Sequence, residues 1–183
     1  MTSVAEVALR AATAADADAI ADLHATSWQD AYRGVLPDHH LAGPIFEDGQ
    51  RFWRQAMSRV GPDDIVLVAE QDGRLIAFVA ARQCAEAGYD ALIAHLHVRP
   101  ELRRRGLGRR LLGAVAERLG ARGHGSACLW VYDANEAAIR FYERLGGCAE
   151  EHGFEDVAGT QIAQTRLVWR DLEALAAACR DDA

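Results

Sequence analysis

The sequence predicts a single-domain protein of mixed helices and strands, in the α/β or α+β class. Apolar residues recur at helical spacing in some segments and form short strand-like runs in others, and both patterns alternate along the chain. The 183 residues suit one domain, and no repeat, low-complexity segment or linker divides them. We therefore expect one domain over residues 1–183.

A short strand and two helices are expected in the first third of the chain. Residues 7–9 form an apolar run, and Thr13 follows as a candidate N-cap. Apolar residues at helical spacing predict a helix over residues 20–32. A second helix is expected around residues 52–57.

A hairpin comes next, because an Asp72-Gly73 turn separates two apolar runs, 65–70 and 75–82. The elements expected after this hairpin are, in chain order, a strand over 92–98, a helix over 107–119, a strand over 127–132, a helix over 135–145, strands near 148–154 and 161–169, and a short alanine-rich helix.

Several of these elements have recognisable ends. Pro100 stops the strand that precedes it, and Gly146-Gly147 is typical of a helix C-cap. The stretch from Asp133 to Glu136 resembles a capping box with Asp133 as the cap. The apolar stripe of the last helix either covers the core or meets a second subunit, so a homodimer is one expectation.

Composition argues against some functional classes. The formal net charge is −7, which does not favour binding of nucleic acid or of an anionic membrane. No apolar run reaches the roughly 20 residues of a transmembrane helix, and Glu6 and Arg10 interrupt the first apolar stretch, unlike a secretory signal. The four cysteines are dispersed without a metal-ligand spacing. We expect reduced thiols, no metal and a cytoplasmic location.

A glycine- and arginine-rich loop joins the 92–98 strand to the following helix. Backbone N–H groups at such a helix start bind phosphate, and glycines let an anion approach closely. Arginines beside the positive end of a helix are unfavourable unless an anion is often present. A solvated basic patch is the alternative. The residues concerned are Arg103, Arg104, Arg105, Gly106, Leu107, Gly108, Arg109 and Arg110.

A second candidate stripe lies on the helix expected over 135–145. Asn135 and Tyr142 are two helical turns apart, and Ala138 lies between them on the same face. An amide, a small residue and a phenol therefore share one stripe. In the alternative reading, Asn135 is a local cap and Tyr142 is a core aromatic.

The two segments together resemble the GNAT-type N-acetyltransferase superfamily. Arg103-x-x-Gly106-x-Gly108, preceded by Leu96-His97-Val98-x-Pro100, is similar to its acetyl-CoA signature, and Asn135-x-x-Ala138-x-x-Phe141-Tyr142-x-x-x-Gly146 is similar to its second block. The resemblance implies a mixed, mostly antiparallel central sheet of six to seven strands, with helices on both faces. It also implies a transferase that uses acetyl-CoA and needs no metal.

The resemblance further implies roles for individual residues. The pantetheine arm of coenzyme A would pair with the backbone of Leu96, His97 and Val98 on a splayed strand. The pyrophosphate would lie on the amides from Arg103 to Gly108, with arginines nearby. Asn135 would contact the cysteamine end. The expected cofactor-binding residues are Leu96, His97, Val98, Arg103, Arg104, Arg105, Gly106, Leu107, Gly108, Arg109, Asn135 and Tyr142.

Tyr142 is the expected general acid, because a phenol of pKa about 10 can protonate a departing thiolate of pKa about 8.5. The general base is open. Trp130 occupies the position where some relatives have a glutamate, which leaves His95, His97, or water relayed from a carboxylate such as Glu70.

The acceptor is expected to be an amine of a small molecule or peptide. In this fold the region between the first two strands walls the acceptor site, and here it contains Trp28, Tyr32 and Asp30. Aromatics and carboxylates could hold a cationic amine, although the aromatics could equally pack the helices onto the sheet. Two alternatives are an acyltransferase with another donor or acceptor, and a non-catalytic acyl-CoA sensor.

Overall fold

A seven-stranded sheet in the order β1-β2-β3-β4-β5-β7-β6 organises the chain in this computed structural model, which describes residues 6–84 and 88–180. Every neighbouring pair is antiparallel except β4 and β5, which are parallel. The strands are β1 (Ala8–Ala11), β2 (Ile65–Gln71), β3 (Arg74–Gln83), β4 (Ala91–Val98), β5 (Ala127–Tyr132), β6 (Cys148–Val157) and β7 (Thr160–Trp169). The expected mixed, mostly antiparallel sheet is confirmed.

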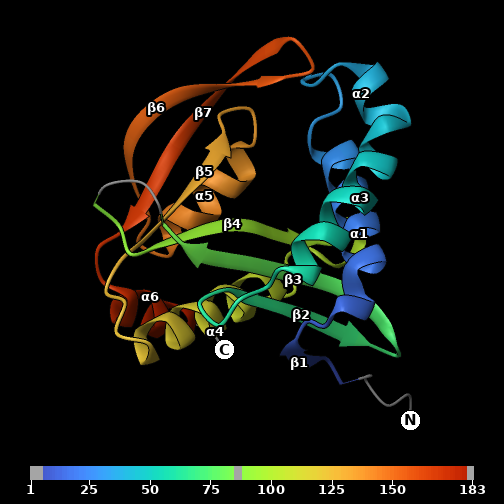
Figure 1. The fold of residues 1–183 in the computed structure, drawn as a ribbon. Helices are drawn as coiled ribbons and strands as arrows, with labels where there is room; N and C mark the ends of the chain where they lie inside the picture. Colours follow the sequence, from blue (N-terminus) through green and yellow to red (C-terminus); the bar gives the residue numbers. More distant parts are fainter. Residues whose placement is uncertain (1–5, 85–87, 181–183) are drawn as a thin grey trace.

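Helices cover both faces of the sheet (Figure 1). The group α1, α2 and α3 lies on one face, and α4 and α6 lie on the other, with α5 beside β5. The α-helices are α1 (Ala17–Ala31), α2 (Asp38–Ala42), α3 (Pro44–Ser58), α4 (Leu107–Ala121), α5 (Glu136–Arg144) and α6 (Leu172–Arg180), and two 3-10 turns precede α1 and α4.

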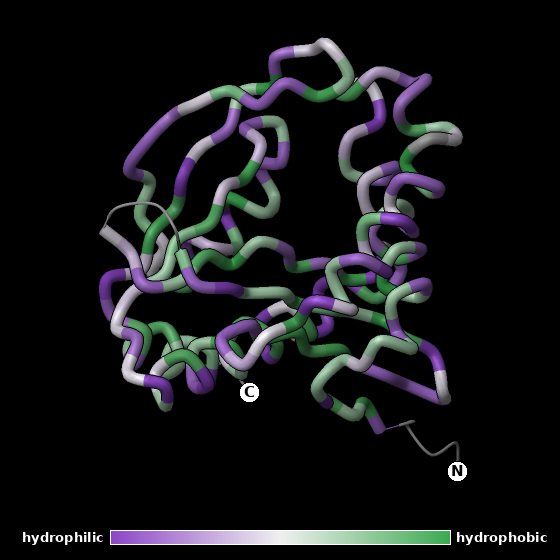
Figure 2. Tube along the Cα trace, in the orientation of Figure 1, coloured by the Kyte–Doolittle hydropathy of each residue, from purple (hydrophilic) through white to green (hydrophobic). Residues whose placement is uncertain are grey.

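The core has one layer on each face, because successive strand residues point in opposite directions. On β2, Leu67 packs against α4 and α6, whereas its neighbour Val68 packs against α1 and α3 with Phe78. These central strands are among the most apolar segments of the chain (Figure 2). The apolar stripe of α6 is buried against α4, so it covers the core of this chain; a homodimer stays a prediction.

The observed elements differ from the expected ones in a few places. The helix α2 was not expected; it is five residues long and contains two adjacent histidines. The cap of α5 is Asn135, whose side chain accepts a hydrogen bond from the Ala138 amide, so the expected Asp133 cap is wrong. Asp133 instead accepts a hydrogen bond from the Thr165 hydroxyl at 2.6 Å.

The parallel pair β4 and β5 separates soon after it begins. Only Ala91–Ala127 and Leu92–Cys128 are in register, and the two strands then diverge. An extra residue, Ala94, lies on β4 where its register with β3 shifts, which is a β-bulge and bends the strand. The expected splay is present.

The hairpin of β6 and β7 curves over the end of α1 and reaches the α2 segment (Figure 1). A separate apolar cluster joins them, in which Tyr32 and Leu41 from the helical side pack with Tyr132, Val157 and Ile162. The β6–β7 hairpin therefore covers the diverging ends of β4 and β5 and packs against the helical layer.

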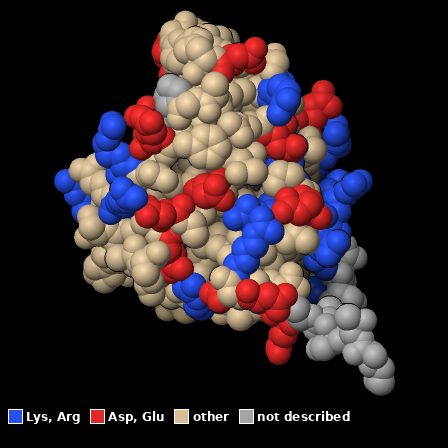
Figure 3. All heavy atoms as spheres, turned by 90° about the vertical axis from the view of Figure 1, so that its right-hand side faces the viewer, with Lys and Arg blue, Asp and Glu red and all other residues tan. Residues whose placement is uncertain are grey.

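The described residues contain no helix that is long and apolar enough to cross a membrane. Over the face that carries α1 and α3, acidic and basic side chains are intermixed, and no field of one sign dominates (Figure 3).

Gly147 is expected to tolerate no side chain, because it follows α5 where the chain turns back towards β6. A Cβ there would lie 2.9 Å from Trp169 Cζ2 and 2.9 Å from the Tyr142 carbonyl oxygen. We expect Gly147→Ala to lower the free energy of unfolding by about 1–3 kcal/mol, the usual effect of overpacking. Urea denaturation of the variant beside Gly49→Ala, whose Cβ would meet open space, checks this. An equal effect at both positions would contradict it.

Candidate active site

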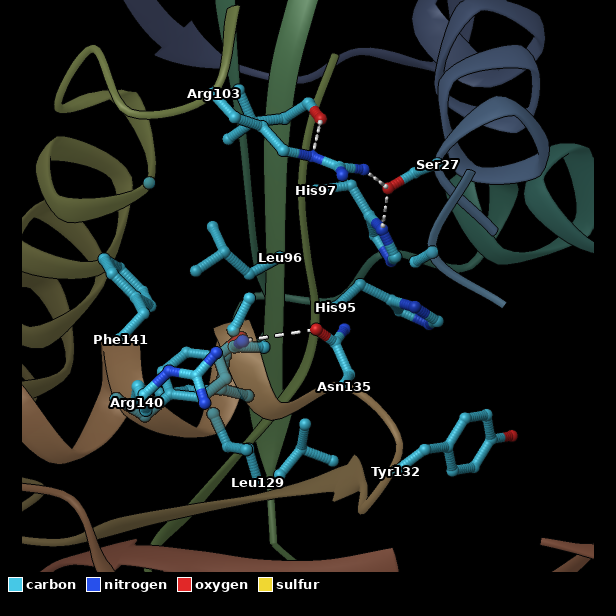
Figure 4. A pocket seen from close by; sticks show the side chains of 18 of the residues that line it. Ser27, His95, Leu96, His97, Arg103, Leu129, Tyr132, Asn135, Arg140 and Phe141 are labelled. Carbon is cyan, nitrogen blue, oxygen red and sulfur yellow. Dashed lines mark hydrogen bonds between the residues drawn. The ribbon is translucent and has the colours of Figure 1, made fainter. Parts of the chain in front are cut away.

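A cavity of about 920 Å³ opens where β4 and β5 diverge. Its lining comes from β4, β5, α1, α5 and the loop before α4, so segments far apart in the chain meet there (Figure 4). The sequence-predicted residues that line it are Leu96, His97, Val98, Arg103, Arg104, Gly106, Leu107, Gly108, Arg109, Asn135 and Tyr142. Arg105 is exposed and is not among them.

The loop before α4 presents backbone amides to this cavity. Arg104 and Gly106 have positive φ values of 62° and 77°, and Gly106 is the N-cap of α4 with no side-chain hydrogen bond to the helix start. The first amides of a helix have no partner within the helix. Left-handed residues near such amides form a concave nest that suits an anion. The strained non-glycine residue Arg104 lies in this same loop.

The arginines of this loop point in different directions. The Arg103 guanidinium forms an ion pair with Asp30 and donates to the Ser27 hydroxyl at 3.3 Å, so it joins the loop to α1. Arg110 donates to the Val7 carbonyl, whereas Arg104 and Arg109 line the cavity. The arginines of this loop that line the cavity are thus Arg103, Arg104 and Arg109.

The two candidate residues of α5 have different surroundings. Asn135 caps the helix through its oxygen and donates through its nitrogen to the Tyr32 hydroxyl at 3.2 Å. Tyr142 lines the cavity but is buried among Phe141 and Trp169 in the core. Burial raises the pKa of the Tyr142 phenol well above its usual value, so the hydroxyl is protonated at neutral pH.

His95 and His97 project from the same face of β4 toward α1, whereas Leu96 points the other way (Figure 4). Residues two apart on a strand point to the same face. Burial lowers the pKa of His95 to about 3 and holds that of His97 well below its usual range. Both rings are therefore neutral and weakly basic at neutral pH. Glu70 is hydrogen-bonded to Arg10 and is not among the residues that line the cavity.

An aromatic wall closes the cavity below the β6–β7 hairpin. Trp28 and Tyr32 of α1 lie edge-on to each other with ring centroids 5.6 Å apart, and Tyr132 of β5 contacts both. The Tyr132 hydroxyl donates to a carboxylate oxygen of Glu155 at 2.8 Å. Trp28 and Tyr32 were sequence candidates. Tyr132 and Glu155 were not, since only the tertiary fold brings β5 and β6 to α1.

A profile of the family described as "Acetyltransferase (GNAT) family" matches residues 18–147. The chain belongs to the GNAT acetyltransferases.

Known proteins are similar to this GNAT chain over most of its length. It is 26% identical over 171 residues to an uncharacterized N-acetyltransferase, YuaI, of Bacillus subtilis (strain 168), covering 92% of this chain and 96% of that one. A mycothiol acetyltransferase of Acidimicrobium ferrooxidans is 40% identical over 106 residues, which cover 57% of this chain and 31% of the relative. The fold resembles the PaiA N-acetyltransferase of Thermoplasma acidophilum, solved with coenzyme A, with a TM-score of 0.69, 20% identity, and coverage of 87% of this chain and 98% of that one.

The geometry of this GNAT chain fits coenzyme A in two respects. Beyond Leu92, the edge of β4 that faces β5 is not paired with that strand, whereas the other edge stays paired with β3. The loop before α4 offers uncapped amides beside Arg104 and Arg109. An extended amide-containing arm suits the first feature and a pyrophosphate suits the second.

Proposed function

We propose that this acyltransferase moves an acetyl group from acetyl-CoA to the primary amine of a small molecule or peptide. The observation that carries the proposal is the cavity between β4 and β5, which has uncapped amides at one end and an aromatic, acidic wall at the other. A donor with phosphates and an acceptor with a cationic amine would enter from these two ends. Acetyl-CoA would supply a thioester that is open to attack.

The donor would be held largely by the main chain. The amides from Arg104 to Gly108 would bind the pyrophosphate, since the Arg103 amide already donates to the Pro100 carbonyl, and Arg104 and Arg109 would help to neutralise its charge. The backbone of Leu96, His97 and Val98 would pair with the pantetheine arm. A backbone N–H of this strand, at Val98 or a neighbour, would then stabilise negative charge on the carbonyl oxygen.

Tyr142 would hold the proton that the leaving sulfur needs. Because burial raises the pKa of this phenol, the hydroxyl carries its proton at neutral pH and would transfer it to the sulfur as the C–S bond breaks. The neutral histidines of β4 are weak bases, and Glu70 is paired elsewhere. We therefore propose that the proton of the amine leaves through water in the cavity.

The acceptor amine would be cationic before it reacts. The faces of Trp28, Tyr32 and Tyr132 can attract an ammonium group, and the Glu155 carboxylate adds an opposite charge beside Tyr132. These side chains favour a cationic amine on a molecule that is otherwise apolar or can pack against aromatic rings. Glu155 of the β6–β7 hairpin would then contribute to acceptor binding.

Neutralising Glu155 should weaken acceptor binding more than turnover. We expect Glu155→Gln to raise KM for a cationic amine about tenfold, equivalent to about 1.4 kcal/mol, with kcat nearly unchanged. Steady-state kinetics over a range of amine concentrations checks this. Glu117→Gln is the matched control, because Glu117 pairs with Arg180 on the opposite side of the sheet. Unchanged KM in Glu155→Gln would remove the hairpin carboxylate from the acceptor site.

Calorimetric titration of the protein with acetyl-CoA, with NAD and ATP as controls, tests the proposed donor. Selective binding of acetyl-CoA, followed by thiol release in the presence of amines, would support acetyl transfer. Binding without thiol release across a broad amine panel would favour an acyl-CoA sensor. Faster release from longer acyl-CoA donors, or with hydroxyl acceptors, would favour another acyltransferase. No binding would overturn the proposal.

A further inference from the structure

Three histidines from two elements meet behind the cavity. His24 comes from α1, and His95 and His97 come from β4, where residues two apart share a face. One ring nitrogen from each lies within 4.8 Å of the others. His95 and His97 also line the cavity, so the cluster is reached from it. No metal-ligand spacing in the sequence pointed to this arrangement, since His24 is about 70 residues from the pair.

The nitrogens of this cluster are only partly used. His24 Nδ1 accepts a hydrogen bond from the Trp53 indole at 3.0 Å, whereas His24 Nε2 is buried and has no hydrogen-bond partner among the described residues. His97 Nδ1 lies 3.1 Å from the Ser27 hydroxyl. An unsatisfied buried nitrogen costs about 1–3 kcal/mol, so His24 Nε2 is a candidate position for a ligand at the centre of the cluster.

We propose that His24, His95 and His97 form a binding site for a divalent first-row transition-metal cation such as Zn²⁺. Imidazole nitrogen is a preferred ligand for Zn²⁺, Ni²⁺ and Cu²⁺, and three protein ligands with one open position are typical of accessible zinc sites. The open position would face the cavity between His95 and His97.

Two features oppose binding and limit the expected affinity. Zinc–nitrogen bonds of about 2.0–2.1 Å need ligand nitrogens about 3.4 Å apart, so the rings must turn inward by about 1 Å. The positive charges of Arg103 and Arg82 also act on the cluster. We therefore expect micromolar binding, weaker than that of structural zinc sites.

Trp53 supplies a specific internal check. Its indole N–H is only a donor, so its bond to His24 Nδ1 places the ring proton on Nε2, the atom that must bind the metal. Coordination by neutral His24 would move that proton to Nδ1 and break the indole bond. We expect Trp53→Phe to bind Zn²⁺ more tightly than the wild-type protein, by about threefold to tenfold.

The test is calorimetric titration of tag-free protein with Zn²⁺, beside the absorption spectrum of bound Co²⁺. We expect one ion per chain, a Co²⁺ spectrum typical of nitrogen ligands in tetrahedral geometry, and at least tenfold weaker binding in His24→Ala, His95→Ala and His97→Ala. The matched control is the double variant His39→Ala/His124→Ala, whose histidines lie outside the cluster.

If a histidine variant does not fold, the absorption spectrum of Co²⁺ bound to the wild-type protein still reports whether the ligands are nitrogen atoms. Stoichiometric binding that is lost in the His39→Ala/His124→Ala protein would overturn the proposal, as would wild-type binding weaker than about 1 mM. The Zn²⁺ titration needs neither acetyl-CoA nor an amine, so its result is independent of the proposed acetyl transfer.

Discussion

Tyr142→Phe should lower the rate of acetyl transfer about a hundredfold, the usual contribution of a positioned acid, while the Kd for acetyl-CoA stays the same. The substitution removes one oxygen from a ring that keeps its contacts with Phe141 and Trp169, so the fold should be retained. Single-turnover measurement of thiol release is the best assay, because product release can limit kcat and hide a slower chemical step.

Tyr89→Phe is the matched control for this variant. The Tyr89 hydroxyl donates a hydrogen bond to Glu150, and Tyr89 does not line the cavity. We expect its single-turnover rate to equal that of the wild-type protein. A Tyr142→Phe rate within twofold of wild type would show that the leaving sulfur receives its proton from another donor, and water would be the first candidate.

Gly108→Trp should abolish measurable acetyl-CoA binding, with a loss of about a hundredfold or more in affinity, equivalent to about 2.8 kcal/mol. A Cβ on Gly108 would already lie 3.4 Å from Phe141 Cζ and 3.9 Å from Val98 Cγ2. Because Gly108 also lines the cavity beside the loop amides, an added indole would take up space where the pyrophosphate is proposed to bind. Calorimetry with acetyl-CoA measures the loss.

Gly120→Trp provides the control on the same helix. A Cβ at Gly120 meets nothing within 4 Å, and Gly120 lies at the far end of α4 from the loop. Circular dichroism should show that both variants fold. If Gly108→Trp retains wild-type affinity, the phosphates are bound elsewhere and the arginines of the loop form a solvated basic patch.

Local patterns were sufficient to predict most of the fold. The Asp72-Gly73 turn has two left-handed residues, as a tight hairpin needs, and the strand over residues 127–132 agrees with β5 at both ends. Gly146 is left-handed after α5, as the C-cap pattern predicted. The helix α2 was missed because five residues after a proline carry too little apolar periodicity to be recognised.

The candidate site was predictable where it is continuous in sequence. The loop from Arg103 to Gly108 and the stripe of Asn135 and Tyr142 are local motifs, and the structure brings both to one cavity. His24 and Glu155 could not be found in this way. Each becomes relevant only when His24 of α1 meets His97 of β4, or when Glu155 of β6 reaches Tyr132 of β5, and a single sequence contains no signal for these contacts.

The bulge at Ala94 and the divergence of β4 from β5 also give the backbone and the side chains of β4 separate roles. If acetyl-CoA is bound through the backbone of β4, recognition of this donor does not depend on the side chains of that strand. Those side chains are then free to change during evolution without loss of the donor. The histidines at positions 95 and 97, which line the cavity, would be one outcome of that freedom.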